Sequence, residues 1–297
     1  IIEKFNFNKF IAILGDIRNK ERLKKIFEHF SPEIVFHAAA YKHVPVMEKN
    51  PSEAVSTNIL GTKILADLSH EFHIEKFIMI STDKAVNPTG IMGATKRIAE
   101  MYIQSLNEHS STAYITTRFG NVLGSNGSVI PRFLKQIKEG GPITITHPEI
   151  TRFFMTIPEA CQLVLEAAAM GKGGEIFIFD MGKPVKILDL AKNLIKLSGY
   201  KEHEIKIKFT GLRPGEKLYE ELFLNTEKHK PTYHPKILIA EVEKNNYEEI
   251  NQYISNFLIP LKQDDTATII KLIKELIPTI ITKPEENSYN FILKKIN

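Results

Sequence analysis

Two side chains that could exchange protons stand next to each other in the first third of the sequence. Asp83 and Lys84 follow Ser81 and Thr82, directly after the apolar run 77–80. A carboxyl group and an amine on one turn can both reach one face of a bound molecule, which suits an acid and a base. The plain alternative is a solvated Asp-Lys turn with no chemical role.

A second pair lies a few residues further on, at Met92 and Lys96. It has the spacing of a Tyr-x-x-x-Lys redox pair, with a thioether in place of the phenol. Residues four apart on a helix share a face, so both side chains would point the same way. Because Met is usually core filler, an isolated Met-x-x-x-Lys would mean little. The preceding Thr82-Asp83-Lys84 run, joined to it by the turn 87–90, makes this pair informative.

The elements that must position these residues alternate between strand-like and helix-like patterns. Runs that are apolar on both faces, each separated by a helix, predict a parallel sheet covered on two sides. Right-handed crossovers then make this a doubly wound α/β fold. We expect strands at 10–14, 34–36, 76–80 and 113–118, and helices at 19–30, 51–72 and 90–106.

Small or polar residues follow three of these strands. Asp16 comes after the first strand, Ala38, Ala39 and Ala40 come after the second, and Ser81 comes after the third. In open α/β sheets, ligands bind beyond the carboxyl ends of the strands. Taken alone, the alanines could simply be tight packing. The three strand ends together predict a crevice for a nucleotide.

The pattern changes after residue 120, where a Gly/Asn/Ser-rich loop begins. We expect a Rossmann-like core over 1–120, a smaller α/β substrate-binding lobe over 121–240 that is interleaved with the core, and a C-terminal helical tail over 241–297. The further elements that we expect are strands at 143–146 and 175–180, a helix at 158–170 that begins with the capping box Thr156–Glu159, and helices at 187–197 and 266–276.

The composition excludes several classes of function. Of 297 residues, 43% are hydrophobic and 25% charged, as in an ordinary globular protein. The formal charge of +4 is small and scattered, which indicates a solvated surface rather than a nucleic-acid groove. No apolar stretch is long enough to span a bilayer, so we expect no membrane contact by this chain.

Cys161 lies in an apolar run and is interpreted as an inert core thiol. His37 and His43 have no second ligand set at suitable spacing, so no metal site is expected.

Several longer stretches make the sequence similar to a known family. It resembles the extended short-chain dehydrogenase/reductase superfamily, and within it the nucleotide-sugar 4,6-dehydratases of the CapD/WbpM type used in bacterial polysaccharide and glycan synthesis. The resemblance covers roughly residues 10–240. The matching stretches, in the expected order, are FHAAAYKHVPVMEKNP, NILGTK, STDKAVNPTGIMGATKR, RFGNVLGSNGSVIPRF, ITRFFMTIPEA and GLRPGEKLYEEL.

The resemblance implies a reaction on UDP-N-acetylglucosamine in which hydride leaves C4, water is lost across C5 and C6, and hydride returns to C6. Asp83 would be the general acid for the 6-hydroxyl and Lys84 the base for H5, with Thr82 hydrogen-bonding the 4-oxygen. The same pair would take the 4-hydroxyl proton, because Met92 can only shape the pocket. Lys84 must be neutral to act. Lys96 and the oxidised nicotinamide would lower the pKa of Lys84, and Asp83 would raise it.

The resemblance also implies binding residues. NAD or NADP is the expected cofactor, and Lys96 would bind its nicotinamide ribose. The further cofactor residues would be Asp16, Ile17, Ala38, Ala39, Ala40, Asn58, Ser81, Phe119 and Gly120. Arg213 and Glu216 match residues that hold the nucleotide diphosphate and ribose. The remaining substrate residues would be Lys42, Asn121, Ser128, Val129, Ile130 and Arg152.

The sequence departs from the family at its beginning, where the Gly-rich loop that binds the cofactor pyrophosphate is missing. We therefore expect that the first βαβ unit is absent, that this chain alone binds NAD(P) weakly or not at all, and that a sheet edge is exposed. We also expect a homo-oligomer in the cytoplasm, at the inner membrane for full-length relatives. Two other hypotheses stay open: a nucleotide-sugar 4-epimerase, and an inactive truncated fragment that binds nucleotide sugars.

Overall fold

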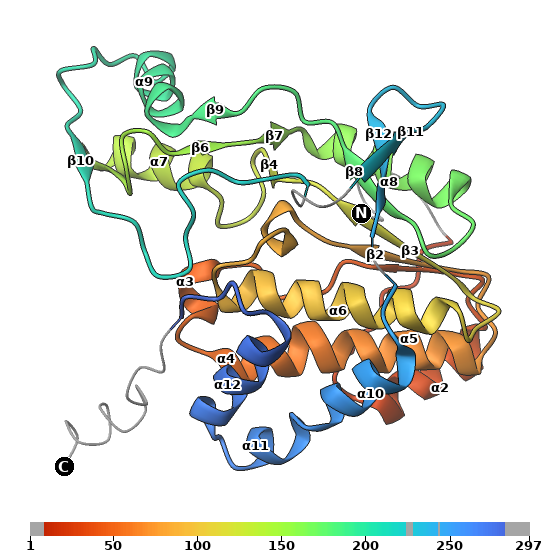
Figure 1. The fold of residues 1–297 in the computed structure, drawn as a ribbon. Helices are drawn as coiled ribbons and strands as arrows, with labels where there is room; N and C mark the ends of the chain where they lie inside the picture. Colours follow the sequence, from red (N-terminus) through yellow and green to blue (C-terminus); the bar gives the residue numbers. More distant parts are fainter. Residues whose placement is uncertain (1–8, 224–227, 243, 283–297) are drawn as a thin grey trace.

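The computed structural model describes residues 9–223, 228–242 and 244–282. At its centre is a six-stranded sheet in the order β1-β2-β3-β8-β12-β11 (Figure 1). The first four strands are parallel, and the last two are antiparallel to their neighbours. The strands are β1 (Ile34–His37), β2 (Lys76–Ile80), β3 (Ala113–Arg118), β8 (Ile176–Phe179), β12 (Ile237–Glu241) and β11 (Lys228–Pro231). The predicted α/β fold with a doubly wound parallel sheet is confirmed.

Helices cover both faces of this sheet because alternate strand residues are apolar on each side. Phe77 and Met79 of β2 join the core under one helical layer, whereas Ile78 joins the core under α8 on the other face. Figure 1 shows the larger layer below the sheet and α8 (Ile157–Met170) above it. The larger layer consists of α2 (Lys20–Phe30), the short α3 (Val44–Met47), α4 (Pro51–Ala54), the π-helix η1 (Val55–Gly61), α5 (Thr62–Glu71) and α6 (Ile91–Asn107).

A smaller lobe stands beyond the carboxyl ends of the parallel strands, at the upper left of Figure 1. Its own core is built from apolar residues of α7, α9 and β5, among them Phe133, Ile145 and Ile195. The lobe contains β4 (Asn121–Val122), α7 (Val129–Lys138), β5 (Ile143–Ile145), β6 (Thr151–Arg152), β7 (Phe154–Met155), β9 (Val185–Lys186), α9 (Ile187–Leu197) and β10 (Ile207–Phe209). β8 and β12 return to the main sheet, and the proposed division at residues 120 and 240 stays a prediction.

Three helices near the end of the described chain pack on the helical layer. They are α10 (Tyr247–Ser255), α11 (Leu258–Lys262) and α12 (Thr266–Leu276). α10 and α12 lie against α6, and α12 also lies against α4, so Ile254 and Ile273 are fully buried in the main core. The helix predicted at 266–276 is confirmed. α10 and α11 lie within the predicted helical tail but were not placed individually, and α7 was not predicted.

Two predictions about individual segments were wrong. Residues 10–14 form no strand, and Ile11 and Leu14 are exposed. An apolar run forms a strand only where another strand offers hydrogen-bond partners, and no described strand lies beside it. Cys161 is exposed on α8 rather than buried in the core. The buried residues Ala160, Leu163 and Val164 form the helical stripe, and Cys161 lies off it.

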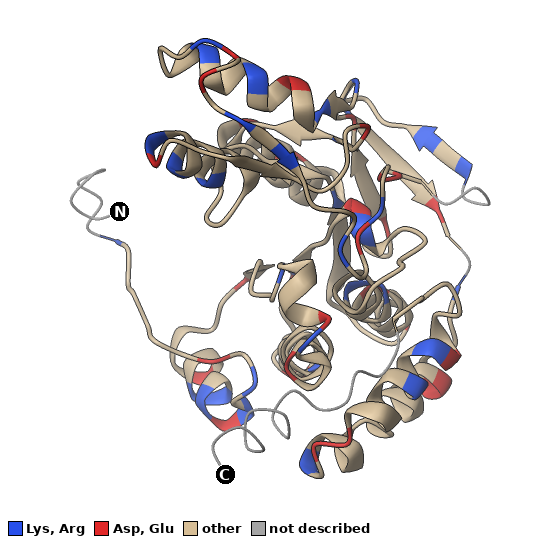
Figure 2. Cartoon of the chain, turned by 90° about the vertical axis from the view of Figure 1, so that its left-hand side faces the viewer, with Lys and Arg blue, Asp and Glu red and all other residues tan. Residues whose placement is uncertain are grey.

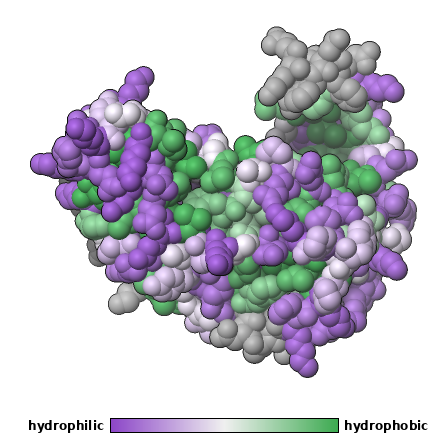
Figure 3. All heavy atoms as spheres, turned by 90° about the horizontal axis from the view of Figure 1, so that it is seen from above, coloured by the Kyte–Doolittle hydropathy of each residue, from purple (hydrophilic) through white to green (hydrophobic). Residues whose placement is uncertain are grey.

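The surface has no single dominant charge. Lys and Arg residues are interspersed with Asp and Glu along the helices (Figure 2). Seen from above, hydrophobic residues gather toward the middle of the face in Figure 3, and hydrophilic residues prevail at its margins. Within the described residues, none of the helices combines the length and the apolar character needed to cross a bilayer.

Candidate active site

A cavity of about 460 Å³ opens between the carboxyl ends of the parallel strands and the smaller lobe. Its walls come from the loop after β1, the end of β2 and the turn after it, the first turns of α6, the residues after β3, the lobe and the segment 213–220. The predicted site residues that line it are Ala38, Ala40, Lys42, Ser81, Thr82, Lys84, Met92, Lys96, Phe119, Gly120, Asn121, Ser128, Val129, Arg152, Arg213 and Glu216. Residues far apart in the sequence therefore meet at one cavity.

The turn after β2 holds the proposed acid–base pair. It is a 3-10 turn, η2 (Asp83–Ala85), capped by the Thr82 hydroxyl, which accepts a hydrogen bond from the Lys84 amide. The Lys84 amine donates to Asp83 Oδ1 at 2.9 Å and to Asn121 Oδ1 at 3.3 Å. Thr82 also donates to Asp83 Oδ1, at 2.8 Å. Asp83 is fully buried behind the wall, and Thr82 and Lys84 face the cavity.

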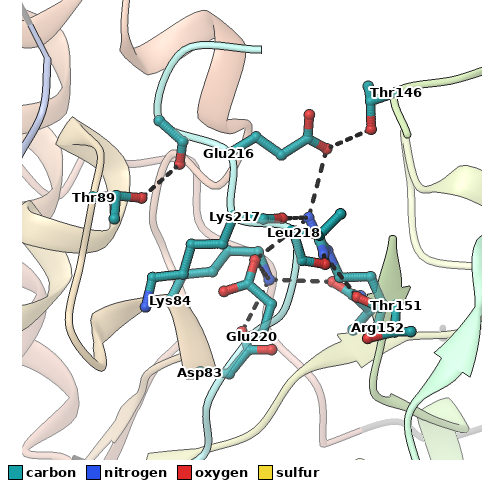
Figure 4. Close-up of polar contacts among 12 residues, drawn as sticks. Asp83, Lys84, Thr89, Thr146, Thr151, Arg152, Glu216, Lys217, Leu218 and Glu220 are labelled. Atoms are coloured by element: carbon teal, nitrogen blue, oxygen red, sulfur yellow. Dashed lines mark hydrogen bonds and ion pairs between the residues drawn. The ribbon is translucent and has the colours of Figure 1, made fainter. Parts of the chain in front are cut away.

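A carboxylate that sequence reasoning missed completes this cluster. Glu220 Oε1 lies 3.9 Å from Lys84 Nζ and 3.6 Å from the Arg152 guanidinium (Figure 4). Burial works against the charged form of Lys84, but the carboxylates of Asp83 and Glu220 outweigh it and raise the Lys84 pKa. Burial raises the pKa of Glu220 as well. The charged stretch that follows Arg213 was the available signal, but the sequence did not show which carboxylate turns inward.

α6 lies unusually close to the turn that carries Lys84. A Cβ atom added at Gly93 would be 2.1 Å from the Lys84 carbonyl oxygen, so only glycine permits this approach. The approach brings Met92 and Lys96, which share a helix face, to the cavity wall. Burial lowers the pKa of Lys96 to about 8, with the Glu100 carboxylate opposing the shift. Lys96 therefore gives up its proton more readily than an ordinary lysine.

A buried ion pair connects α6 to the carboxyl ends of β2 and β3. Arg118 at the end of β3 and Glu100 on α6 are both fully buried. The guanidinium donates two hydrogen bonds to the carboxylate, at 3.0 and 2.7 Å. The Ser81 hydroxyl donates to the same carboxylate. The pair therefore links α6 to the ends of β2 and β3, where the cavity begins.

The loop after β1 is held by the π-helix. Asn58 of η1 accepts from the Tyr41 amide at 2.8 Å and donates to the Tyr41 carbonyl at 3.0 Å. It also donates to the Thr95 hydroxyl of α6 at 3.1 Å. Asn58 is fully buried and does not line the cavity. Its amide fixes the loop against α6, and Lys42, the next residue of that loop, lines the cavity.

The segment 213–220 crosses the cavity from the side of the lobe. Gly215 sits against Gly90, where a Cβ atom on Gly90 would be 2.8 Å from the Gly215 Cα. Arg152 donates to the carbonyls of Lys217 at 2.9 Å and Leu218 at 3.3 Å (Figure 4). Arg152 therefore holds this segment in place in addition to lining the cavity.

Arg213 and Glu216 form an ion pair within the same segment. Their charged groups are 3.2 Å apart, and the Thr146 hydroxyl also donates to Glu216. Arg132 of α7 lines the cavity near them, and its pKa is lowered, mainly by burial and secondly by the Arg213 charge. Two guanidinium groups thus stand at one side of the cavity.

In addition to Asp83, which was predicted to be catalytic, five predicted binding residues lie away from the cavity: Asp16, Ile17, Ala39, Asn58 and Ile130. Asp16 is bound by Arg18, whose hydrogen bonds lower the Asp16 pKa to about 2. Ile17 packs on the main core beside Gly61.

His37 is buried against Thr62, and burial lowers its pKa to about 3. Among the residues described, no group of three His, Cys, Asp or Glu side chains could hold a metal ion.

A parallel Rossmann-type sheet with a Thr-Asp-Lys turn and a Lys-bearing helix at its carboxyl edge defines an enzyme fold of the short-chain dehydrogenase/reductase class. The chain belongs to the family described as "Polysaccharide biosynthesis protein", which matches it over residues 2–242. The resemblance to the CapD-like polysaccharide biosynthesis family is confirmed.

Three similar proteins illustrate the relationship. The capsular polysaccharide biosynthesis protein CapD of Staphylococcus aureus is 57% identical over 251 residues, which are 84% of this chain and 42% of CapD. The UDP-glucose 4-epimerase of Rickettsia canadensis is 41% identical over 215 residues, 70% of this chain and 60% of the epimerase. The X-ray structure of Pen from Bacillus thuringiensis superposes with a TM-score of 0.73 at 38% identity, over 86% of this chain and 85% of that one. The chain spans less than half the length of CapD.

Proposed function

We propose that this chain carries the catalytic site of a UDP-N-acetylglucosamine 4,6-dehydratase that serves bacterial surface polysaccharide synthesis. The observation that supports the proposal is the position of Lys84 at the wall of a cavity that Lys96 also lines, with Asp83 buried directly behind Lys84 and hydrogen-bonded to its amine at 2.9 Å. Loss of water across C5 and C6 needs a group that removes H5 and a group that protonates the departing hydroxyl. A carboxyl and an amine in direct contact provide both.

The proton balance of the elimination closes within this pair. Lys84 takes the proton from C5, the C6–O bond breaks, and Asp83, which must turn out from behind the wall, gives a proton to the departing oxygen. The direct hydrogen bond between the two groups then allows a proton to pass from Lys84 back to Asp83. One water leaves, and both groups end as they began. Thr82 lines the cavity beside them, and its hydroxyl, which donates to Asp83 here, would have to turn from Asp83 to donate to the 4-oxygen of the sugar.

The cavity residues fit the nicotinamide end of NAD(P). Ala38 and Ala40 leave room at the strand ends, and the amine of Lys96 can bind ribose hydroxyls. When bound, the cofactor would take hydride from C4 and return it to C6. Asp16 and Ile17 lie away from the cavity, so the cavity lining does not support the predicted contact of these two residues with the cofactor.

The guanidinium groups at the lobe side suit a nucleoside diphosphate. Arg213 and Arg132 line the cavity there, and planar guanidinium groups pair well with phosphate oxygens. Lys42 reaches the cavity from the opposite loop and donates to Ser125 at 3.4 Å. We propose that these three cations hold the diphosphate of the UDP-sugar, with the sugar directed toward Lys84.

A 4-epimerase is the second candidate, favoured by the identity of 41% to the Rickettsia canadensis enzyme. The two reactions are separated by the mass of the product. Incubation of the complete protein with UDP-N-acetylglucosamine and NAD(P) would give a product lighter by one water if the protein is a dehydratase. An epimerase leaves the mass unchanged, and a product of unchanged mass with altered C4 configuration would overturn the proposal.

A further inference from the structure

Glu220 is buried at the centre of the acid–base cluster. Its side chain is 4% exposed and stands between Lys84 at 3.9 Å and Arg152 at 3.6 Å. Both cations contact Oε1, whereas the buried Oε2 atom has no hydrogen-bond partner among the described residues. A carboxylate placed in this way costs free energy to bury, and its two cationic neighbours lie at ion-pair rather than hydrogen-bond distance. Such a group calls for a reason beyond packing.

The charges that face Glu220 come from three elements. Lys84 and Asp83 belong to the turn after β2, Arg152 belongs to β6, and Lys217 belongs to the segment of Glu220 itself. Burial and the Asp83 carboxylate raise the pKa of Glu220, while the three cations act against them. Lys84 is thus flanked by two carboxylates, one in a direct hydrogen bond and one across a gap of 3.9 Å.

We propose that Glu220 is a positioning residue for Lys84, holding the Lys84 amine at the cavity wall and competing with it for one proton. The proposal deepens the proposed function and rests on it for its catalytic meaning. While Glu220 is ionised, two carboxylates favour the ammonium form of Lys84, which cannot remove H5. When Glu220 takes up a proton, one of these two carboxylate charges is lost and the neutral amine becomes easier to form.

The exchange between Lys84 and Glu220 moves a single proton from one group to the other. One N–H bond of Lys84 breaks and one O–H bond of Glu220 forms, so an ion pair becomes two neutral groups and no outside donor is needed. In a buried site the neutral pair avoids the cost of desolvating two charges. The neutral Lys84 can then take the proton from C5. The direct contact with Asp83 remains available for returning that proton to the departing hydroxyl.

The test uses the neighbouring carboxylate as a matched control. Glu221 is adjacent in the chain, but its side chain is 41% exposed and pairs with Lys217 and Asn87. The complete protein is compared with its Glu220→Gln, Glu220→Asp and Glu221→Gln variants. Acetic anhydride reacts only with neutral amines, so the pH dependence of Lys84 acetylation, followed by mass spectrometry, reports the Lys84 proton without requiring turnover.

Glu220→Gln should shift the Lys84 acetylation profile to lower pH by roughly one unit or more, because one nearby negative charge is removed. Glu221→Gln should leave the profile unchanged. Glu220→Asp, which keeps the charge on a shorter side chain, should fall between wild type and Glu220→Gln, and it decides the question if Glu220→Gln does not fold. A profile of Glu220→Gln that coincides with wild type, or an equal shift in Glu221→Gln, would overturn the proposal.

A kinetic comparison separates this proposal from the proposed function. If the wild type removes water from UDP-N-acetylglucosamine, the acid limb of kcat/KM should move to lower pH in Glu220→Gln and recover toward wild type in Glu220→Asp. If the wild type yields no dehydrated product, the proposed function fails. The acetylation profiles then still decide whether Glu220 governs the protonation of Lys84.

Discussion

The Lys84 amine donates a hydrogen bond to the Asn121 amide oxygen at 3.3 Å, and this contact joins the two parts of the molecule that enclose the cavity. Lys84 belongs to the turn after a central strand, whereas Asn121 is the first residue of the smaller lobe. The position of the proposed base therefore depends on how the lobe sits on the sheet. Substitutions at the turn and at its supports should affect activity and stability in separable ways.

Removal of the acid–base pair should abolish dehydration while sparing substrate binding. In the complete protein, Asp83→Asn and Lys84→Met should each lower kcat by about 10²–10⁴-fold, which is the usual contribution of a positioned proton-transfer group. The double variant should lose little more than either single variant, since the two groups act together. Calorimetric titration with UDP-sugar checks that binding remains. Wild-type turnover in the double variant would refute the assigned roles.

Lys96 should make the stability of the protein depend on alkaline pH. Its pKa is about 8 in the folded chain, compared with 10.5 for an unperturbed lysine. Between these values the unfolded chain keeps a proton that the folded chain has lost, so stability rises with pH across this window. Below pH 8 Lys96 is charged in both the folded and the unfolded chain. The cost of burying that charge, on the order of 3 kcal/mol, then lowers the free energy of unfolding in full.

Lys96→Met should therefore stabilise the protein at pH 7, and its advantage over wild type should shrink as the pH approaches 10. Urea unfolding at the two pH values measures the difference. Lys172→Met, at an exposed position, serves as the control and should show no comparable change between the two values. An advantage of Lys96→Met that is equal at both pH values would contradict the assignment.

Gly93→Ala should damage the turn that carries the proposed base. The new methyl group would lie 2.1 Å from the Lys84 carbonyl oxygen, so α6 and the turn must separate. Overpacking of this kind costs about 1–3 kcal/mol and displaces the backbone. We expect a lower urea midpoint together with a lower kcat. Gly15→Ala is the matched control, because a Cβ there would meet only Ile26 at 3.8 Å.

Removing one member of the buried pair of Glu100 and Arg118 should lower the free energy of unfolding more than replacing both members. Either Glu100→Met or Arg118→Met leaves one charge in the core without this partner, which typically costs about 3–5 kcal/mol. Replacing both residues by Met should cost less than either single change. Urea unfolding of the three variants forms a double-mutant cycle. Strictly additive losses would show that the pair is not coupled.

Most of the main sheet could be predicted from sequence because its signals are local. β2 and β3 have the predicted bounds, since each is a short apolar run between turn residues. The run 10–14 has the same local character and still forms no strand. Strand formation depends on a neighbour, and the apolar pattern of a segment does not reveal whether that neighbour exists. For Cys161, the spacing of its buried neighbours could have indicated an outward position.

The candidate site could be predicted where its members are close in sequence. Thr82, Asp83, Lys84, Met92 and Lys96 lie within one strand–turn–helix unit, so their spacing carried the inference. Glu220 reaches Lys84 from more than a hundred positions away, and only the folded chain brings it there. Asn58 was predicted to bind the cofactor, but it holds the loop after β1 instead. The π-helix turns its amide toward Tyr41 and away from the cavity.

The contacts made by residues 279–281 have a consequence for how the site forms during synthesis. Thr279 donates to the Pro88 carbonyl at 2.7 Å, and the Ile281 amide donates to the Thr89 carbonyl at 3.1 Å. These bonds secure the turn from which α6 starts, yet their donors are made almost two hundred residues later. While the nascent chain is still on the ribosome, the sheet can assemble first. The start of α6 gains these two bonds only after residue 281 has emerged from the exit tunnel.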